Sequence, residues 1–295
     1  MKAQNVCIPC ILDDLVGAIR TLKLSPETSR KVIREALGYL AKGFDGSRPP
    51  ASYITEIHRT LKRVTGITVP FAEARERANQ VCLKLAARIR GEIKDLSDLE
   101  CFHRLVRLAV AGNELDFRTV GTGYGVTEKD MDSRLREAAS RPLAVDEIGK
   151  IYEAAGEARE VLFLHDNVGE IALDRLLIEE LKRLGARVTS ALRGGPITSD
   201  ATVKDGKMVG LDQVAQVIEA GPDTLGISFE EMSPALKKAL TGTDLILSKG
   251  QANYYVLSEH RQEVNAPIAY LIRTKCDLVA SEFGQKGRVS IAALR

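Results

Sequence analysis

Short apolar segments alternate with amphipathic segments throughout the second half of the sequence, and this alternation constrains the fold more than any other feature. Val161-Leu162-Phe163-Leu164 is a continuous apolar run of the kind that a strand buried on both faces requires. Similar segments predict further strands at residues 187–192, 224–228, 244–248, 268–272 and 278–280, with helices at 170–184, 211–220 and 234–240. The fold class is therefore α/β, with a Rossmann-like, doubly wound and mostly parallel sheet.

The first half of the sequence has apolar residues at helical spacing instead. Ser25-Pro26 is a typical helix start, since serine caps the helix and proline fits the first turn. Helices are predicted at residues 11–22, 26–40, 51–65, 70–93, 97–111, 128–140 and 145–156. We therefore expect an all-helical domain at residues 1–110, with the helical pattern extending to about residue 156. An α/β metal- and phosphate-binding domain is expected at residues 111–295.

Composition argues against several classes of partner. The 42 Lys and Arg residues nearly balance the 40 Asp and Glu residues, so the sequence lacks the basic excess of a nucleic-acid or membrane-surface protein. No run of 18 apolar residues and no secretory leader is present, so we expect no membrane partner and a cytoplasmic location. Homo-oligomer formation is left open.

Asp166 and Asn167 directly follow the apolar strand of residues 161–164, and Gly169 allows a tight turn into the next helix. Ligands of open α/β sheets bind beyond the carboxyl ends of the strands. A carboxylate and an amide oxygen at such an end suit a hard cation such as Mg²⁺ or Mn²⁺. On spacing alone, either residue could instead serve only as a helix cap.

Asp200 follows the next predicted strand along the chain. Neighbouring strands of a sheet are about 5 Å apart, so its carboxylate could complete the same cation site. An isolated loop aspartate is more often a turn residue, and that alternative remains.

Lys249-Gly250 stands at the end of another predicted strand, with Asn253 one helical turn further on. A lysine there can direct its ammonium group at a phosphate, and glycine lets backbone amides approach the same anion. The segment Ala111–Phe117 ends a predicted helix, and Gly121–Gly125 beyond it could form a loop over a site.

The remaining motif is Cys7-Ile8-Pro9-Cys10. One CxxC supplies two of the four ligands of a structural zinc site, so a second metal would need other partners, such as Cys82, Cys101 or His103. A structural role for Cys7 and Cys10 is the alternative, and a redox role is less favoured because no βαβ unit adjoins the motif.

Taken together, these motifs resemble those of the damage-control phosphatases, a family long catalogued as a domain of unknown function. The resemblance is closest to its compact archaeal-type members, which begin with a CxxC. Five segments carry it in the family's order: Cys7–Cys10, Ala111–Phe117, Asp166–Glu170, Ser199–Thr202 with Asp205, and Lys249–Asn253.

The resemblance implies a divalent cation (Mg, Mn, Co or Ni) held by Asp166, Asn167 and Asp200, and a small phosphorylated metabolite as substrate. It also implies that Lys249 contacts the phosphate and joins Asp166 and Asp200 in catalysis. The remaining substrate-binding residues expected on this basis are Asn113, Asp116, Glu170, Gly250 and Asn253. The predicted function is a metal-dependent phosphomonoester hydrolase.

Two other functions are considered. Haloacid-dehalogenase phosphatases place a second aspartate two residues after the first, where this sequence has Val168. A non-catalytic metal- or metabolite-binding protein remains the alternative, because an α/β fold does not by itself imply an enzyme.

Overall fold

The computed structural model describes residues 1–116 and 128–295 of the chain. Its first half is helical: α1 (Cys7–Thr21), α2 (Pro26–Gly43), α3 (Pro50–Thr65), α4 (Ala72–Ile93), α5 (Asp98–Gly112) and α6 (Glu128–Ser140). The helices of the second half are α7 (Ile148–Glu157), α8 (Glu170–Arg183), α9 (Val203–Met208), α10 (Pro234–Thr241), α11 (Gly250–Glu259) and α12 (Asp277–Glu282). The strands are β1 (Val145–Asp146), β2 (Glu160–Leu164), β3 (Arg187–Leu192), β4 (Gln216–Glu219), β5 (Leu245–Lys249), β6 (Ile268–Arg273) and β7 (Ser290–Leu294).

The strands form one sheet in the order β1-β7-β6-β5-β2-β3-β4. Strands β4, β3, β2, β5 and β6 are parallel to their neighbours, whereas β7 pairs antiparallel with β6 and β1 runs parallel to β7. The predicted fold class, an α/β protein with a mostly parallel sheet, is confirmed.

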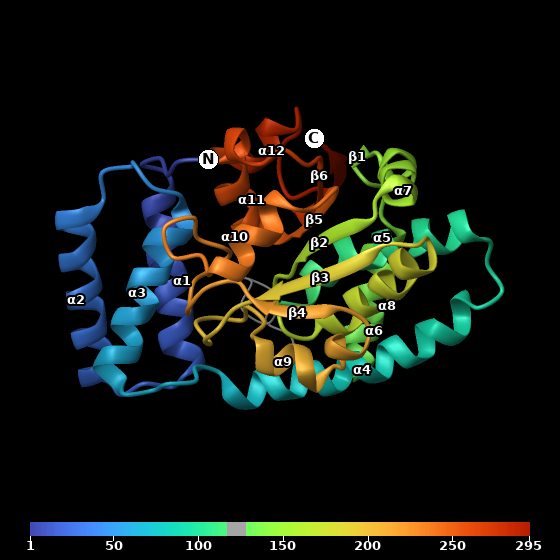
Figure 1. The fold of residues 1–295 in the computed structure, drawn as a ribbon. Helices are drawn as coiled ribbons and strands as arrows, with labels where there is room; N and C mark the ends of the chain where they lie inside the picture. The colour runs from blue at the N-terminus through green and yellow to red at the C-terminus, as the bar shows by residue number, and fades with distance from the viewer. Residues whose placement is uncertain (117–127) are drawn as a thin grey trace.

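Alternate residues of the central strands face opposite sides of the sheet. Val161 and Phe163 belong to the apolar core shared with α4, α5 and α8, while Leu162 and Leu164 belong to the core shared with α10 and α11. This explains the continuous apolar run in the sequence, because both faces of β2 are covered. In Figure 1 the two groups of helices lie on either side of the sheet.

Helices α1–α3 form a separate cluster beside one end of the sheet, drawn in blue in Figure 1. Their core, which includes Ile11, Val32 and Ile57, extends along the chain to Phe71. Helices α4 and α5 instead pack on α8 and share the core of the sheet. We therefore propose that the boundary between the helical unit and the α/β unit lies near Phe71, in place of the expected boundary at residue 110.

Three predicted elements were wrong, and the strands β1, β4 and β7 were not predicted. Residues 224–228 form a loop and not a strand, and the expected helix at 211–220 is a short 3-10 turn, Leu211–Gln213, followed by β4. Edge strand β4 has a polar residue at each end and lacks a buried apolar run, so its sequence resembles a helix surface as much as a strand. Residues 278–280 lie in α12, and the strand that closes this side of the sheet is β7.

In the part of the chain that the structure describes, no helix combines the length and apolar character needed to cross a bilayer. The segment Gly121–Gly125, expected to form a loop over a site, lies outside the described residues.

Candidate functional site

The sequence motifs meet at the carboxyl ends of β2, β3, β5 and β6. From β2 the chain continues outward to β3 and β4, and it then returns to form β5 and β6 on the other side of β2. The junction between β2 and β5 is therefore the point where the winding direction reverses, and open α/β sheets form a crevice for ligands at such a point.

Asp166 and Asn167 leave β2 and are fixed by backbone contacts with the segment after β3. Asn167 and Asp200 form an isolated antiparallel bridge, and the backbone N–H of Ala201 donates to the Asp166 carbonyl over 2.7 Å. The Asn167 side-chain amide donates to Asp166 Oδ2 over 2.8 Å, and its Oδ1 accepts from Ser199 Oγ over 2.8 Å. The two segments therefore form one unit, and it presents both carboxylates together.

Gly250 follows β5 and lies against the Asp166 carboxylate. Its φ is +77°, and a Cβ at this position would come within 2.0 Å of Asp166 Oδ2. Any other residue would therefore displace the Asp166 side chain, which gives Gly250 a steric role in the site.

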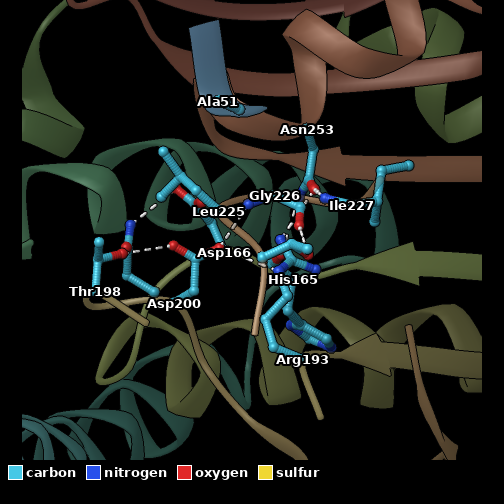
Figure 2. A network of polar contacts seen from close by, with 12 residues as sticks. Ala51, His165, Asp166, Arg193, Thr198, Asp200, Leu225, Gly226, Ile227 and Asn253 are labelled. Atoms are coloured by element: carbon cyan, nitrogen blue, oxygen red, sulfur yellow. Dashed lines mark hydrogen bonds and ion pairs between the residues drawn. The ribbon is translucent and has the colours of Figure 1, made fainter. Parts of the chain in front are cut away.

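The Asp200 carboxylate is held by three donors, as Figure 2 shows in part. Oδ2 accepts from Arg193 Nε over 3.1 Å and from the Gly226 backbone N–H over 2.8 Å, and Oδ1 accepts from Thr198 Oγ1 over 3.0 Å. Gly226 lies in the loop that was predicted to be a strand, so this loop delivers an amide to the site.

Helix α4 holds both acidic segments from outside the sheet. Arg75 donates to the carbonyl oxygens of Thr198 and Asp200 over 2.7 and 2.8 Å, and it pairs with Asp205 over 2.6 Å. Asn79 accepts from the Gly169 backbone N–H over 2.7 Å and donates to Asp205 over 3.0 Å. Arg75 and Asn79 therefore fix the separation of the segments after β2 and β3.

The surroundings of the Asp166 carboxyl group disfavour its negative charge. It makes no ion pair with any described residue, although its side chain is buried. Burial raises the pKa of the Asp166 carboxyl well above its ordinary value, and the nearby Glu170 and Asp200 raise it further, while Lys275 lowers it. A bound cation would remove this electrostatic cost.

These groups open into a cavity of about 320 Å³ between the sheet and helices α1 and α3. Asp116, Asp166, Asn167 and Asp200 line it, and so does Lys275. Helices α1 and α3 contribute Cys10, Asp13, Asp14 and Ile54 to its wall. The cavity is thus shared between the helical unit and the α/β unit.

Five of the six expected substrate-binding residues are not among the described residues that line this cavity: Asn113, Glu170, Lys249, Gly250 and Asn253. Lys249 is fully buried and pairs with Glu170 over 3.2 Å and with Asp174 over 2.8 Å. Asn113 donates to Glu170 over 2.8 Å, and Asn253 donates to the backbone carbonyls of His165 and Lys249. Lys249, Glu170, Asn113 and Asn253 therefore form or support the layer behind the cavity.

Cys7 and Cys10 begin α1, and all five cysteines are free. Cys7 is buried in the core of the helical unit, whereas Cys10 is exposed at the cavity. Cys82 and Cys101 lie in the core of the sheet domain and cannot join them. Among the described residues, no three His, Cys, Asp or Glu side chains are grouped as metal ligands.

Several residues of the site were missed from the sequence. Lys275 lines the cavity and lies 3.4 Å from the Asp116 carboxylate. It follows β6 closely, so the rule that favoured Lys249 applies to Lys275 as well. Arg75 and Arg193 gave no comparable signal, because their positions depend on contacts across more than one element.

The family model of the damage-control phosphatase ARMT1-like domain matches residues 3–289 of the chain. A damage-control phosphatase of Archaeoglobus fulgidus is 31% identical over 285 residues, which cover 96% of each chain. A damage-control phosphatase of Pyrococcus horikoshii is 29% identical, over 96% of this chain and 94% of that protein. An uncharacterized protein of Methanocaldococcus jannaschii is 30% identical, over 96% and 92%.

The fold is similar to the crystal structure of a DUF89 family protein from Pyrococcus horikoshii. The TM-score is 0.87 at 28% identity, and the match covers 99% of this chain and 98% of the other. The resemblance to this family that the sequence motifs indicated is confirmed, because the family model matches residues 3–289. The chain belongs to the damage-control phosphatase ARMT1-like domain family.

Proposed function

We propose that this protein is a divalent-metal-dependent phosphatase that hydrolyses small phosphorylated metabolites. Its family and the names of two relatives support a phosphatase. The observation that carries the proposal is the buried Asp166 carboxylate, which opens with Asn167 and Asp200 on one cavity and has no ion-pair partner among the described residues.

The donor set fits a hard divalent cation. Asp166 and Asp200 offer carboxylate oxygens and Asn167 an amide oxygen, a combination that suits Mg²⁺, Mn²⁺, Co²⁺ or Ni²⁺ better than a thiophilic ion. Since no three His, Cys, Asp or Glu side chains form a cluster among the described residues, the amide is needed to complete a protein-derived set of three. A cation bound here would offset the charge of a phosphate ester and stabilise the charge that develops during transfer.

We assign the phosphate contact to Lys275 in place of Lys249. The Lys275 side chain lines the cavity and is 43% exposed, whereas that of Lys249 is fully buried between two carboxylates. Asp116 pairs with Lys275 over 3.4 Å and orients its ammonium group. A phosphate dianion between Lys275 and the acidic group would meet positive charge on both sides once a cation is bound.

We assign to Asp166 the role of base for the attacking water. Asp200 is engaged by Arg193, so Asp166 is the carboxylate of the pair that lacks an ion-pair partner in the described structure. A new P–O bond forms to the water oxygen, whose proton passes to the Asp166 carboxylate. The ester P–O bond breaks, and the leaving oxygen takes a proton from solvent.

The cavity limits the size of the substrate. Its volume of about 320 Å³ lies at the lower end of the range of ligand pockets, about 300–1,000 Å³. Ile54, Leu225 and Ala252 give part of its wall an apolar surface, and Asp13 and Asp14 give another part hydrogen-bond acceptors. This composition suits a compact, partly polar phosphate ester.

Hydrolysis of p-nitrophenyl phosphate, measured with Mg²⁺, Mn²⁺, Co²⁺ or Ni²⁺ and with a chelator, tests the proposal. Turnover should require a divalent cation and should be lost in Asp166→Ala. The matched control is Asp212→Ala, an exposed aspartate away from the cavity, which should retain wild-type turnover. Full metal-dependent turnover by Asp166→Ala would contradict the assigned site.

A panel of phosphorylated metabolites then separates an enzyme from a binding protein. A phosphatase should release inorganic phosphate from at least one compact ester, with Asp166→Ala inactive on the same compound. Binding of such esters without phosphate release under any metal would support the non-catalytic alternative.

A further inference from the structure

Lys249 connects two buried carboxylates in the layer behind the cavity. Its ammonium group lies 2.8 Å from Asp174 Oδ1 and 3.2 Å from Glu170 Oε2, and all three side chains are at most 1% exposed. Burial lowers the pKa of Lys249, but Asp174 and Glu170 outweigh burial and raise it above its ordinary value. The ammonium group of Lys249 therefore stays protonated and forms ion pairs with these two carboxylates.

Glu170 uses its other oxygen to hold Asn167. Its Oε1 accepts from the Asn167 backbone N–H over 2.7 Å and lies 3.3 Å from the Asn167 side-chain nitrogen. The Asn113 amide donates to Oε2 over 2.8 Å from the opposite side. Glu170 contacts the Asn167 side-chain nitrogen, and Ser199 donates a hydrogen bond to the Asn167 side-chain oxygen. The Asn167 amide therefore has a single orientation at the cavity wall.

We propose that Lys249 is a positioning residue that acts through Glu170 to fix the Asn167 amide in the cation site. The inference rests on the proposed metal-dependent function and assigns Lys249 no contact with substrate. Partners one step behind the ligands orient them, and losing such a partner typically weakens metal affinity about 10–100-fold.

A direct phosphate contact by Lys249 makes a different prediction. In that case, removing the ammonium group would weaken binding of inorganic phosphate and leave metal affinity unchanged in the absence of phosphate. The positioning role predicts the reverse: metal affinity falls even when no phosphate is present. Calorimetric titration of the phosphate-free protein with Mn²⁺ therefore distinguishes the two roles.

The first titration compares the wild type with Asp200→Asn, and it tests the proposed cation site itself. The wild type should bind Mn²⁺ at one site that Asp200→Asn weakens strongly. Absence of Mn²⁺ binding by the wild type would overturn both the proposed function and this inference.

The second titration uses Lys249→Met combined with Asp174→Asn. This double substitution removes one positive and one negative charge, so the net charge of the buried layer is unchanged. Replacing Asp174 together with Lys249 means that Asp174 is not left as a second buried carboxylate without a cation, beside Glu170. We expect the dissociation constant for Mn²⁺ to rise at least about 10-fold. The control is Ile151→Ala in the core of α7, which destabilises the fold by cavity formation and should leave the constant unchanged.

Gly112→Ala provides an independent test that changes no charge. A Cβ at Gly112 would come within 3.0 Å of Glu170 Cβ and 3.2 Å of its Oε2, so it displaces Glu170 from the other side. We expect a smaller rise, of several-fold, in the dissociation constant for Mn²⁺. This variant keeps the inference testable if the Lys249 variant does not fold.

Wild-type Mn²⁺ affinity in both Lys249→Met/Asp174→Asn and Gly112→Ala would overturn the positioning role while leaving the cation site intact. Loss of inorganic phosphate binding by the first variant, with Mn²⁺ affinity unchanged, would show that Lys249 acts on the phosphate instead.

Discussion

Two acidic segments reach the cavity from neighbouring strands, and their surroundings differ in charge. Asp200, after β3, is bound by Arg193, Thr198 and the Gly226 backbone. Asp166, after β2, receives a side-chain hydrogen bond from Asn167 and faces the carboxylates of Glu170 and Asp200. The comparison indicates different roles for the two residues: Asp200 holds the surrounding segments together through its hydrogen bonds, and Asp166 provides the negative charge that a cation would neutralise.

The contacts that helix α4 makes with the two segments also differ in charge. It holds the segment after β3 through the charged Arg75 and the segment after β2 through the neutral Asn79. Stability should therefore depend more on the contacts of the segment after β3, and metal-dependent function more on the segment after β2. Chemical denaturation of the chelator-treated protein can test this difference at single residues.

The largest effect on stability is expected for Asp200→Ala. Arg193 is fully buried, so the substitution leaves an uncompensated guanidinium group, which costs about 3–5 kcal/mol in comparable cases. The free energy of unfolding should fall by that amount. Asp223→Ala, which removes the partly exposed partner of Arg59 and Lys62, is the control and should cost less than about 1 kcal/mol. Equal losses in the two variants would contradict the anchoring role.

Arg75→Met should have the next largest effect. It removes two hydrogen bonds to backbone carbonyls and the pair with Asp205, and hydrogen bonds to charged groups contribute about 1.5–3 kcal/mol. We expect a loss of about 2–3 kcal/mol in the free energy of unfolding, together with weaker Mn²⁺ binding as the segment after β3 shifts. Arg90→Met, on the same helix, removes a half-exposed pair with Glu179 and is the control, with an expected cost of less than about 1 kcal/mol. Unchanged Mn²⁺ affinity in Arg75→Met would show that α4 does not set the site's geometry.

Asn79→Ala should cost less. It leaves the Gly169 N–H and one Asp205 oxygen without their partner, a loss of about 1–2 kcal/mol. Since this contact holds the segment that carries Asp166, turnover should fall more per unit of stability lost than in Arg75→Met. If Arg75→Met instead loses more turnover per unit of unfolding free energy lost, then turnover depends more on the segment after β3 than on the segment after β2.

The smallest change in stability, with the opposite sign, is expected for Asp166→Asn. The substitution replaces a buried carboxylate that has no ion pair among the described residues by a neutral amide of similar shape. The metal-free protein should unfold at a higher denaturant concentration, with a gain of about 1 kcal/mol, while metal-dependent turnover is lost. A lower midpoint than the wild type would mean that Asp166 contributes to the fold as Asp200 does.

Much of the fold could be predicted from local sequence patterns, because a strand that is buried on both faces of a parallel sheet appears in the sequence as a continuous apolar run. The apolar run of β2 is an example, and so is the helical spacing of the first half. Edge strands leave a weaker trace, since one side of them faces solvent or a helix end. This is why the edge strands β1 and β4 were missed while the central strands were not; β7, which was also missed, lies between β1 and β6.

The sequence by itself determined which residue types stand at three of the strand ends: Asp166 with Asn167, Asp200, and Lys249 with Gly250. Their order also indicated the family to which the chain belongs. Only the tertiary structure decided which lysine reaches the cavity, because that depends on where buried carboxylates lie. Glu170 and Asp174, on α8, come close to Lys249 only when the helix packs against the sheet, and their pairing directs Lys249 inward and leaves Lys275 at the cavity.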